Sequence, residues 1–187
     1  MEVSRWFAEL NTELNGSSDR SCVIVAASII EHQLTECLRA RLVPSGAAQD
    51  SLLEGATAPR GSFSAKIDLA YRVGLIGQQL ARDLHLVRRM RNEQAHSING
   101  RLFSDPGLRD QVGHLVSSQD LKSRAPFLLS SPYDSVRGQF IVCAILIVAH
   151  FNSELQRIRP LQGVGLDGLY TCSYSDSGNT KRTGEIK

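Results

Sequence analysis

The stretch DLHLVRRMRNEQAHSING, residues Asp83–Gly100, decides how this chain is expected to fold. One helix face of this stretch carries apolar residues at steps of three and four, namely Leu84, Val87, Ala95 and Ile98. Only Arg91 completes that row, so its side chain is expected to face the interior. A guanidinium in the interior needs a charged partner, because desolvating it alone is very costly. The predicted partner in this buried ion pair is Glu31, at the edge of an earlier apolar helix face.

Length and composition indicate one globular domain. The chain has 187 residues, 42% of them apolar, and a net charge of only +2, which gives no broad electrostatic surface for nucleic acid. The four cysteines form no CxxC pair, and Cys22, Cys37 and Cys143 lie within apolar helical runs. They are expected to be reduced core thiols of a cytoplasmic protein. The first ten residues, MEVSRWFAEL, show no basic region followed by an apolar one, so no signal peptide is expected.

The longest apolar run, Phe140–Phe151, predicts a central helix rather than a membrane span. Its twelve residues are too few to cross a bilayer. Charged or polar residues stand in and around it, at Arg137, His150 and Glu154. We therefore expect it to be buried on most sides.

Periodicity and capping residues predict an all-α, single-domain bundle of five or six helices over residues 1–160, followed by a flexible tail over 161–187. The expected helices span 4–14, 20–42, 63–74, 77–100, 106–116 and 135–159. The first would bury Trp6, Phe7, Leu10 and Leu14. Residues 44–61 and 117–133 are expected to be loops, the second polar with two prolines. No alternation typical of a strand is visible.

The pattern R-N-x-x-x-H at Arg91, Asn92 and His96 is the candidate catalytic site. Arginine can hold a phosphate and histidine can transfer a proton near neutral pH, so the pair could support metal-independent RNA cleavage. Asn92, four residues before His96, could orient the imidazole. On an unbroken helix, however, Arg91 and His96 point roughly 140° apart. One chain could not easily grip a phosphate with both, so the helix would have to break or two chains would have to combine. A purely structural role is the alternative.

Two further binding sites are candidates. Ala70, Gly74 and Leu80 match the spacing of a helix-turn-helix near 66–87, which would offer Gln79, Arg82 and His85 to a DNA groove. Asp83 stands where that motif expects an apolar residue, and net charge is low, so direct DNA binding is not the favoured interpretation. Another candidate, a polyanion contact, is formed by Arg82, Arg88 and Arg89. The five histidines lack the short spacing of a zinc site, and neither a metal nor a cofactor is expected.

Three segments resemble the mannitol operon repressor family: SDRSCVIVAASIIEHQLTECLRARLV (18–43), GSFSAKIDLAYRVGLI (61–76) and DLHLVRRMRNEQAHS (83–97). The family motif commonly carries an aromatic residue where this chain has Gln94. The resemblance implies a helical bundle without a dedicated DNA-binding domain, acting as a transcriptional regulator through protein partners. The Arg91–His96 pattern also resembles the HEPN (higher eukaryote and prokaryote nucleotide-binding) superfamily. Many of its members are dimeric metal-independent ribonucleases, and the resemblance implies Arg91 and His96 as their catalytic pair.

The favoured interpretation is a cytoplasmic, mannitol-repressor-like regulator, a homodimer that binds a protein of a sugar-uptake or transcription system. The first alternative is a HEPN-type endoribonuclease, for which RNA would be the substrate. The second is direct DNA binding through the helix-turn-helix pattern. No membrane partner is expected.

Overall fold

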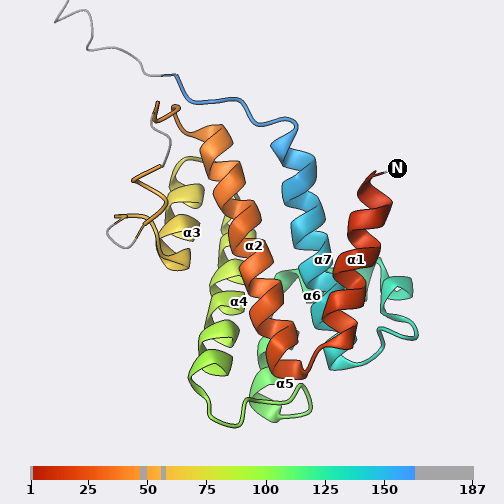
Figure 1. Ribbon diagram of the computed structural model, residues 1–187. Coiled ribbons are helices and arrows are strands. Elements are labelled where there is room, and N and C mark those ends of the chain that lie inside the picture. Colours follow the sequence, from red (N-terminus) through yellow and green to blue (C-terminus); the bar gives the residue numbers. More distant parts are fainter. Residues whose placement is uncertain (1, 47–49, 56–57, 163–187) are drawn as a thin grey trace, which may run out of the picture.

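The computed structural model describes residues 2–46, 50–55 and 58–162, with the side chains of these ranges from Ala8 onward except that of Leu121. Within them the chain forms seven α-helices, one short 3-10 helix and no strand (Figure 1). In order these are α1 (Glu2–Gly16), α2 (Asp19–Arg41), α3 (Phe63–Arg72), α4 (Gln78–His96), α5 (Pro106–Gly113), α6 (Val116–Arg124), η1 (Pro126–Leu129) and α7 (Val136–Leu155). The predicted all-α class is confirmed, with one α-helix more than expected.

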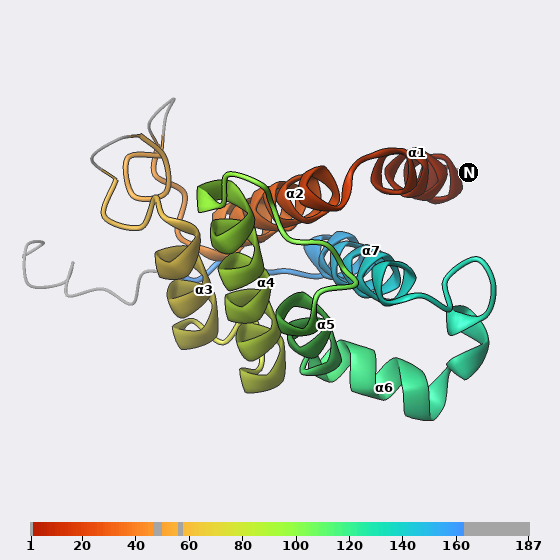
Figure 2. The same ribbon diagram turned by 90° about the horizontal axis from the view of Figure 1, so that it is seen from below.

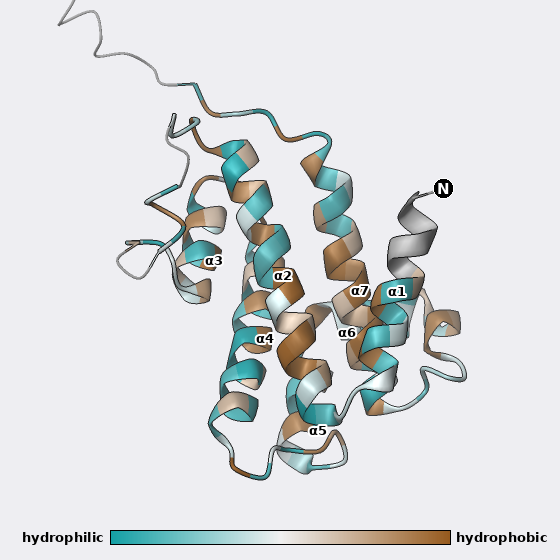
Figure 3. Cartoon of the chain, in the orientation of Figure 1, coloured by the Kyte–Doolittle hydropathy of each residue, from teal (hydrophilic) through white to brown (hydrophobic). Residues whose placement is uncertain are grey.

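Helices α2 and α7 form the centre of the bundle. They pack against each other, while α2 also contacts α1, α3 and α4 (Figures 1 and 2). Serine side chains fix where the long helices begin, because Ser18 accepts a hydrogen bond from the Ser21 amide and Ser135 accepts one from the Gly138 amide. The prediction of a buried central helix at Phe140–Phe151 is confirmed, since half of α7 is fully buried and its middle turns are largely hydrophobic (Figure 3).

By length and composition alone, α2 and α7 could each cross a membrane. Half of the apolar window in each is buried inside the bundle, however, where the two helices contact each other. Core helices of a folded domain pass the same test.

Three of the predicted core thiols are buried and unpaired, as expected: Cys22, Cys37 and Cys143. Burial raises the pKa of each from 9.0 to about 11, because a thiolate would lose its hydration there. They are therefore protonated and poorly nucleophilic at neutral pH. Cys172 lies outside the described residues.

The predicted loop over 117–133 is wrong for most of its length, because α6 and η1 form between Val116 and Leu129. The sequence VSSQDLKSR of α6 carries no apolar stripe, and its beginning is fixed instead by a distant residue. Both carboxylate oxygens of Asp83 in α4 accept hydrogen bonds, from the backbone amides of Val116 (2.7 Å) and Ser117 (2.9 Å). The first turn of α6 is thus capped by tertiary structure rather than by its own chain neighbours.

Several helix ends also differ from prediction. Helix α4 ends at His96 instead of Gly100, α5 at Gly113 instead of 116, and α7 at Leu155 instead of 159. Of the first helix's predicted apolar side, Leu10 and Leu14 are buried, while the side chains of Trp6 and Phe7 lie outside the described residues. The predicted tail is described only to residue 162, and the Leu161 amide donates to the Arg41 carbonyl at the end of α2 (2.7 Å).

Candidate functional site

The inner face of α4 does not follow the predicted row. Leu84 and Val87 are buried as expected, but the row continues through Met90 and Gln94, which are 0% and 1% exposed. Ala95 is exposed, and Ile98, 94% exposed, lies beyond the end of the helix. Arg91 therefore stands at the edge of the core, with 35% of its side chain exposed.

Arg91 contacts Glu31 from this half-buried position. Its Nη2 lies 3.3 Å from Glu31 Oε2, while the Nζ of Lys66 lies 3.3 Å from Glu31 Oε1. One carboxylate thus links α2 to both α3 and α4. Sequence analysis missed Lys66, although the signal was available, because Lys66 stands with Phe63, Ile67 and Ala70 on the apolar face of α3.

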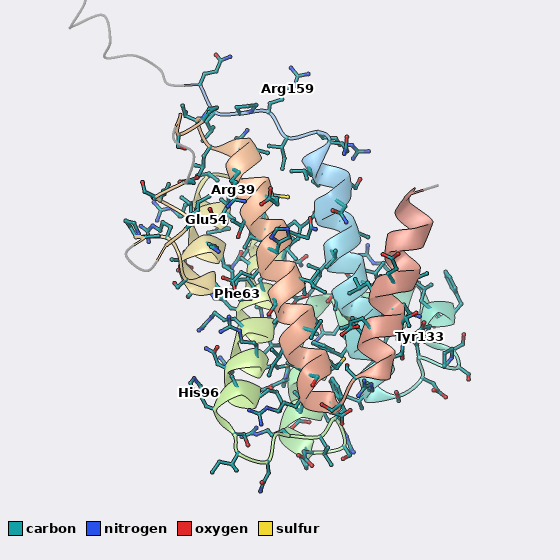
Figure 4. The ribbon with its side chains drawn as sticks, in the orientation of Figure 1. Arg39, Glu54, Phe63, His96, Tyr133 and Arg159 are labelled. Atoms are coloured by element: carbon teal, nitrogen blue, oxygen red, sulfur yellow. The ribbon has the colours of Figure 1, made fainter. Side chains whose placement is uncertain are left out.

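The three residues of the R-N-x-x-x-H pattern are not brought together in one chain. Arg91 Nη1 donates to Asn92 Oδ1 (3.1 Å), so this amide oxygen orients the guanidinium and not the imidazole of His96. His96 is the exposed last residue of α4 and points away from the bundle (Figure 4). Because α4 is unbroken from Gln78 to His96, the roughly 140° between Arg91 and His96 persists.

Gln94 fixes the turn that follows α4. Its amide nitrogen donates to the Arg101 carbonyl (2.7 Å), and its amide oxygen accepts from the Arg101 amide (2.8 Å). The turn includes Gly100 at a φ of +66°, a backbone conformation that favours glycine. The buried Gln94 side chain therefore joins α4 to the following turn through two hydrogen bonds to backbone groups.

The outer face of α4 forms the wall of a cavity of about 610 Å³ between α3, α4 and α5. Figure 2 shows α4 between the other two helices. The polar side chains that line the cavity are Tyr71, Gln78, Arg82, His85, Arg89, Gln111 and His114. Ala81 and Leu86 complete the lining, and it contains no carboxylate.

The predicted polyanion contact is therefore divided. Arg82 and Arg89 line the cavity, whereas Arg88 does not, and the Nε of Arg88 is buried without a hydrogen-bond partner. Among the described residues, neither Arg82 nor Arg89 has an ion-pair or hydrogen-bond partner. His85 does have one, because its Nε2 lies 3.2 Å from an oxygen of Asp68.

The residues of the helix-turn-helix pattern have clear structural positions. Ala70 is buried, Gly74 adopts a φ of +68° in the turn after α3, and Asp83 is buried with its carboxylate on α6. Gln79 and Arg82 are exposed on the first two turns of α4. DNA binding by this surface stays a prediction.

Across the part of the chain that the structure describes, no group of three or more His, Cys, Asp or Glu side chains is placed to hold a metal ion.

Comparisons with known proteins leave the family open but place the fold. No family model matches the sequence, and no curated protein matches it either. Among solved structures, a chain in the X-ray structure of the MtlR–HPr complex from Escherichia coli matches with a TM-score of 0.61. The chain has an MtlR-like fold. The match covers 79% of this chain and 98% of the MtlR-like chain, with 18% sequence identity, so the likeness concerns the fold.

Proposed function

We propose that this protein is a mannitol-repressor-like transcriptional regulator that acts by binding a protein partner. The observation that carries the proposal is the fold, which matches 98% of a chain that was crystallised in a complex with HPr. The resemblance of residues 18–97 to the mannitol operon repressor family supports the same function independently of the fold comparison. Neither line of support needs a DNA-binding surface on this chain.

The partner class that we propose is a protein of the sugar phosphotransferase system, such as HPr, and the proposed location is the cytoplasm. The regulator would act as a homodimer. Residues 1–160 would form the folded unit. The Glu31–Arg91 ion pair would have a structural role, because it joins α2 to α4.

A direct test is to titrate the purified full-length chain with HPr from the same genome. Calorimetry measures the binding, and size-exclusion chromatography detects the complex. We expect a stoichiometric complex that an unrelated protein of matched size and charge does not form. In cells, deletion of the gene should change transcription of a sugar-uptake operon. Absence of an HPr complex together with unchanged transcripts would contradict the proposal.

A HEPN-type, metal-independent endoribonuclease is the second candidate. The exposure of two side chains favours this candidate, since His96 is exposed and one-third of the Arg91 side chain is exposed. Both side chains could therefore reach a groove shared by two copies of the chain. In that dimer Arg91 would hold the phosphate, His96 would transfer the proton and Asn92 would orient Arg91.

The ribonuclease candidate is tested by incubating the protein with RNA in the presence of a chelator, beside Arg91→Ala and His96→Ala. Cleavage by the wild type that both substitutions abolish would support it. Mixing the two inactive variants adds a sharper test. If one copy supplies Arg91 and the other supplies His96, a mixed dimer contains one intact pair and regains part of the activity, whereas a site formed within one chain would stay inactive. Intact RNA at high protein concentration would exclude this activity.

A further inference from the structure

The cavity between α3, α4 and α5 contains two arginines without counterions. Arg82 and Arg89 are seven residues apart, which places them two turns apart on the same side of α4. Helical carboxylates at a spacing of three or four residues would normally pair with such arginines. The residues three and four positions away from Arg82 are all uncharged or histidine, namely Gln78, Gln79, His85 and Leu86. Arg89 has Glu93 four positions further on, but that carboxylate contacts Gln111 and Arg101 instead.

The nearby carboxylates contact groups other than the two arginines. Asp83 lies on the opposite side of α4 with both oxygens on α6, and Asp68 contacts His85. Glu93 accepts from the Gln111 amide nitrogen at 3.0 and 3.1 Å, and its Oε2 lies 3.1 Å from Arg101 Nη1. Within the described residues, neither Arg82 nor Arg89 therefore has a direct carboxylate partner.

The shape and lining of the cavity suit a small molecule better than a bare anion. A volume of about 610 Å³ lies within the usual range for ligand pockets and exceeds what inorganic phosphate fills. Apolar surface from Ala81 and Leu86 and the half-exposed ring of Tyr71 provide a face for an apolar or aromatic group. The guanidinium groups provide paired donors that match phosphate oxygens.

We infer that this cavity binds a small organic phosphate, a phosphate monoester carrying an apolar or aromatic group. Arg82 and Arg89 contact the phosphate, and Tyr71 and Leu86 contact the remainder of the ligand. The inference does not rest on the proposed regulator function, because it needs neither HPr nor a second copy of the chain.

The test adds three probes in turn to the full chain: AMP, adenosine and inorganic phosphate. Calorimetry measures the binding of each, and NMR chemical shifts show whether the cavity residues are affected. AMP should bind more tightly than either of its parts. Arg82→Gln and Arg89→Gln should each weaken AMP binding by roughly tenfold or more, since each removes a charge-assisted hydrogen-bond donor. Arg124→Gln is the matched control, because Arg124 is an exposed arginine of α6 outside the cavity, and it should leave the affinity unchanged.

Three results with the small-molecule probes would overturn the inference. They are no binding of any probe at millimolar concentration, equal binding of adenosine and AMP, or AMP affinity that neither arginine substitution alters. Salt-sensitive binding of duplex DNA or RNA, lost in Arg82→Gln while AMP does not bind, would also overturn it, since the face would then contact a nucleic-acid backbone. HPr titrations of the same variants separate this result from the proposed function.

Discussion

The inner and outer faces of α4 both carry polar side chains, and they differ in what those side chains contact. On the inner face, Asp83 and Gln94 each satisfy two backbone groups of later segments, and Arg91 contacts Glu31 at the edge. On the outer face, Arg82 and Arg89 line a cavity without a protein partner among the described residues. A buried polar group that hydrogen-bonds within the protein stabilises the fold, whereas an exposed, unpaired side chain is available to a ligand.

The largest effect on stability is expected at Asp83. Asp83→Ala removes two short hydrogen bonds and the cap of α6, and should lower the free energy of unfolding by about 3 kcal/mol. Urea denaturation followed by circular dichroism measures the change. The neighbouring Arg82→Ala is the control. A loss at Asp83 no larger than that of its neighbour would show that α6 forms without the cap.

Gln94 is expected to have the next largest effect. Gln94→Ala leaves the backbone groups of Arg101 without their partners and should cost roughly 2 kcal/mol. Amide hydrogen exchange should accelerate at Arg101, whose N–H then loses its acceptor. His96→Ala, at an exposed site two residues away, provides the comparison. Unchanged protection at Arg101 would argue against this role of Gln94.

Loss of the Arg91 side chain should lower the free energy of unfolding by less than loss of a fully buried cation would. Loss of a fully buried pair costs about 3–5 kcal/mol. Because Arg91 is one-third exposed and Lys66 stays beside Glu31, we expect Arg91→Ala to cost about 1 kcal/mol. A double-mutant cycle with Glu31→Gln isolates the coupling between the two residues. A coupling energy well above about 1 kcal/mol would show that the pair contributes more to the stability of the bundle than its exposure suggests.

The outer-face arginines should contribute almost nothing to stability. Arg82→Gln and Arg89→Gln, alone or together, are expected to stay within about 0.5 kcal/mol of the wild type in urea denaturation. A small stabilisation would also fit, since two uncompensated like charges would be removed. A substantial loss would mean that these arginines serve the fold, and the contrast between the two faces would disappear.

Sequence patterns predicted the long elements well because local physics determines them. Ser18, Ser62 and Ser135 cap the helices that follow, and the apolar run at Phe140–Phe151 becomes the buried centre of α7. The Arg91 row was misjudged by one position. Met90 and Arg91 both continue a three-to-four spacing from Val87, and only the packing of α4 in the bundle decides that Met90 is the buried one.

The site was less predictable than the fold. The sequence grouped Arg82, Arg88 and Arg89 as one candidate polyanion contact, which stays a prediction, and only Arg82 and Arg89 line the cavity. It could not supply Tyr71, Gln111 or His114, which come from other helices and meet α4 only after packing.

The sequence by itself determined the helical class, the positions of most helices and the buried centre, since capping and periodicity act over a few residues. Tertiary structure alone decided that 116–124 is helical, that Gln94 holds the following turn, and which charges remain unpaired. These outcomes depend on side chains reaching backbone groups far along the chain, as Asp83 does to Val116, and no local pattern encodes such distances.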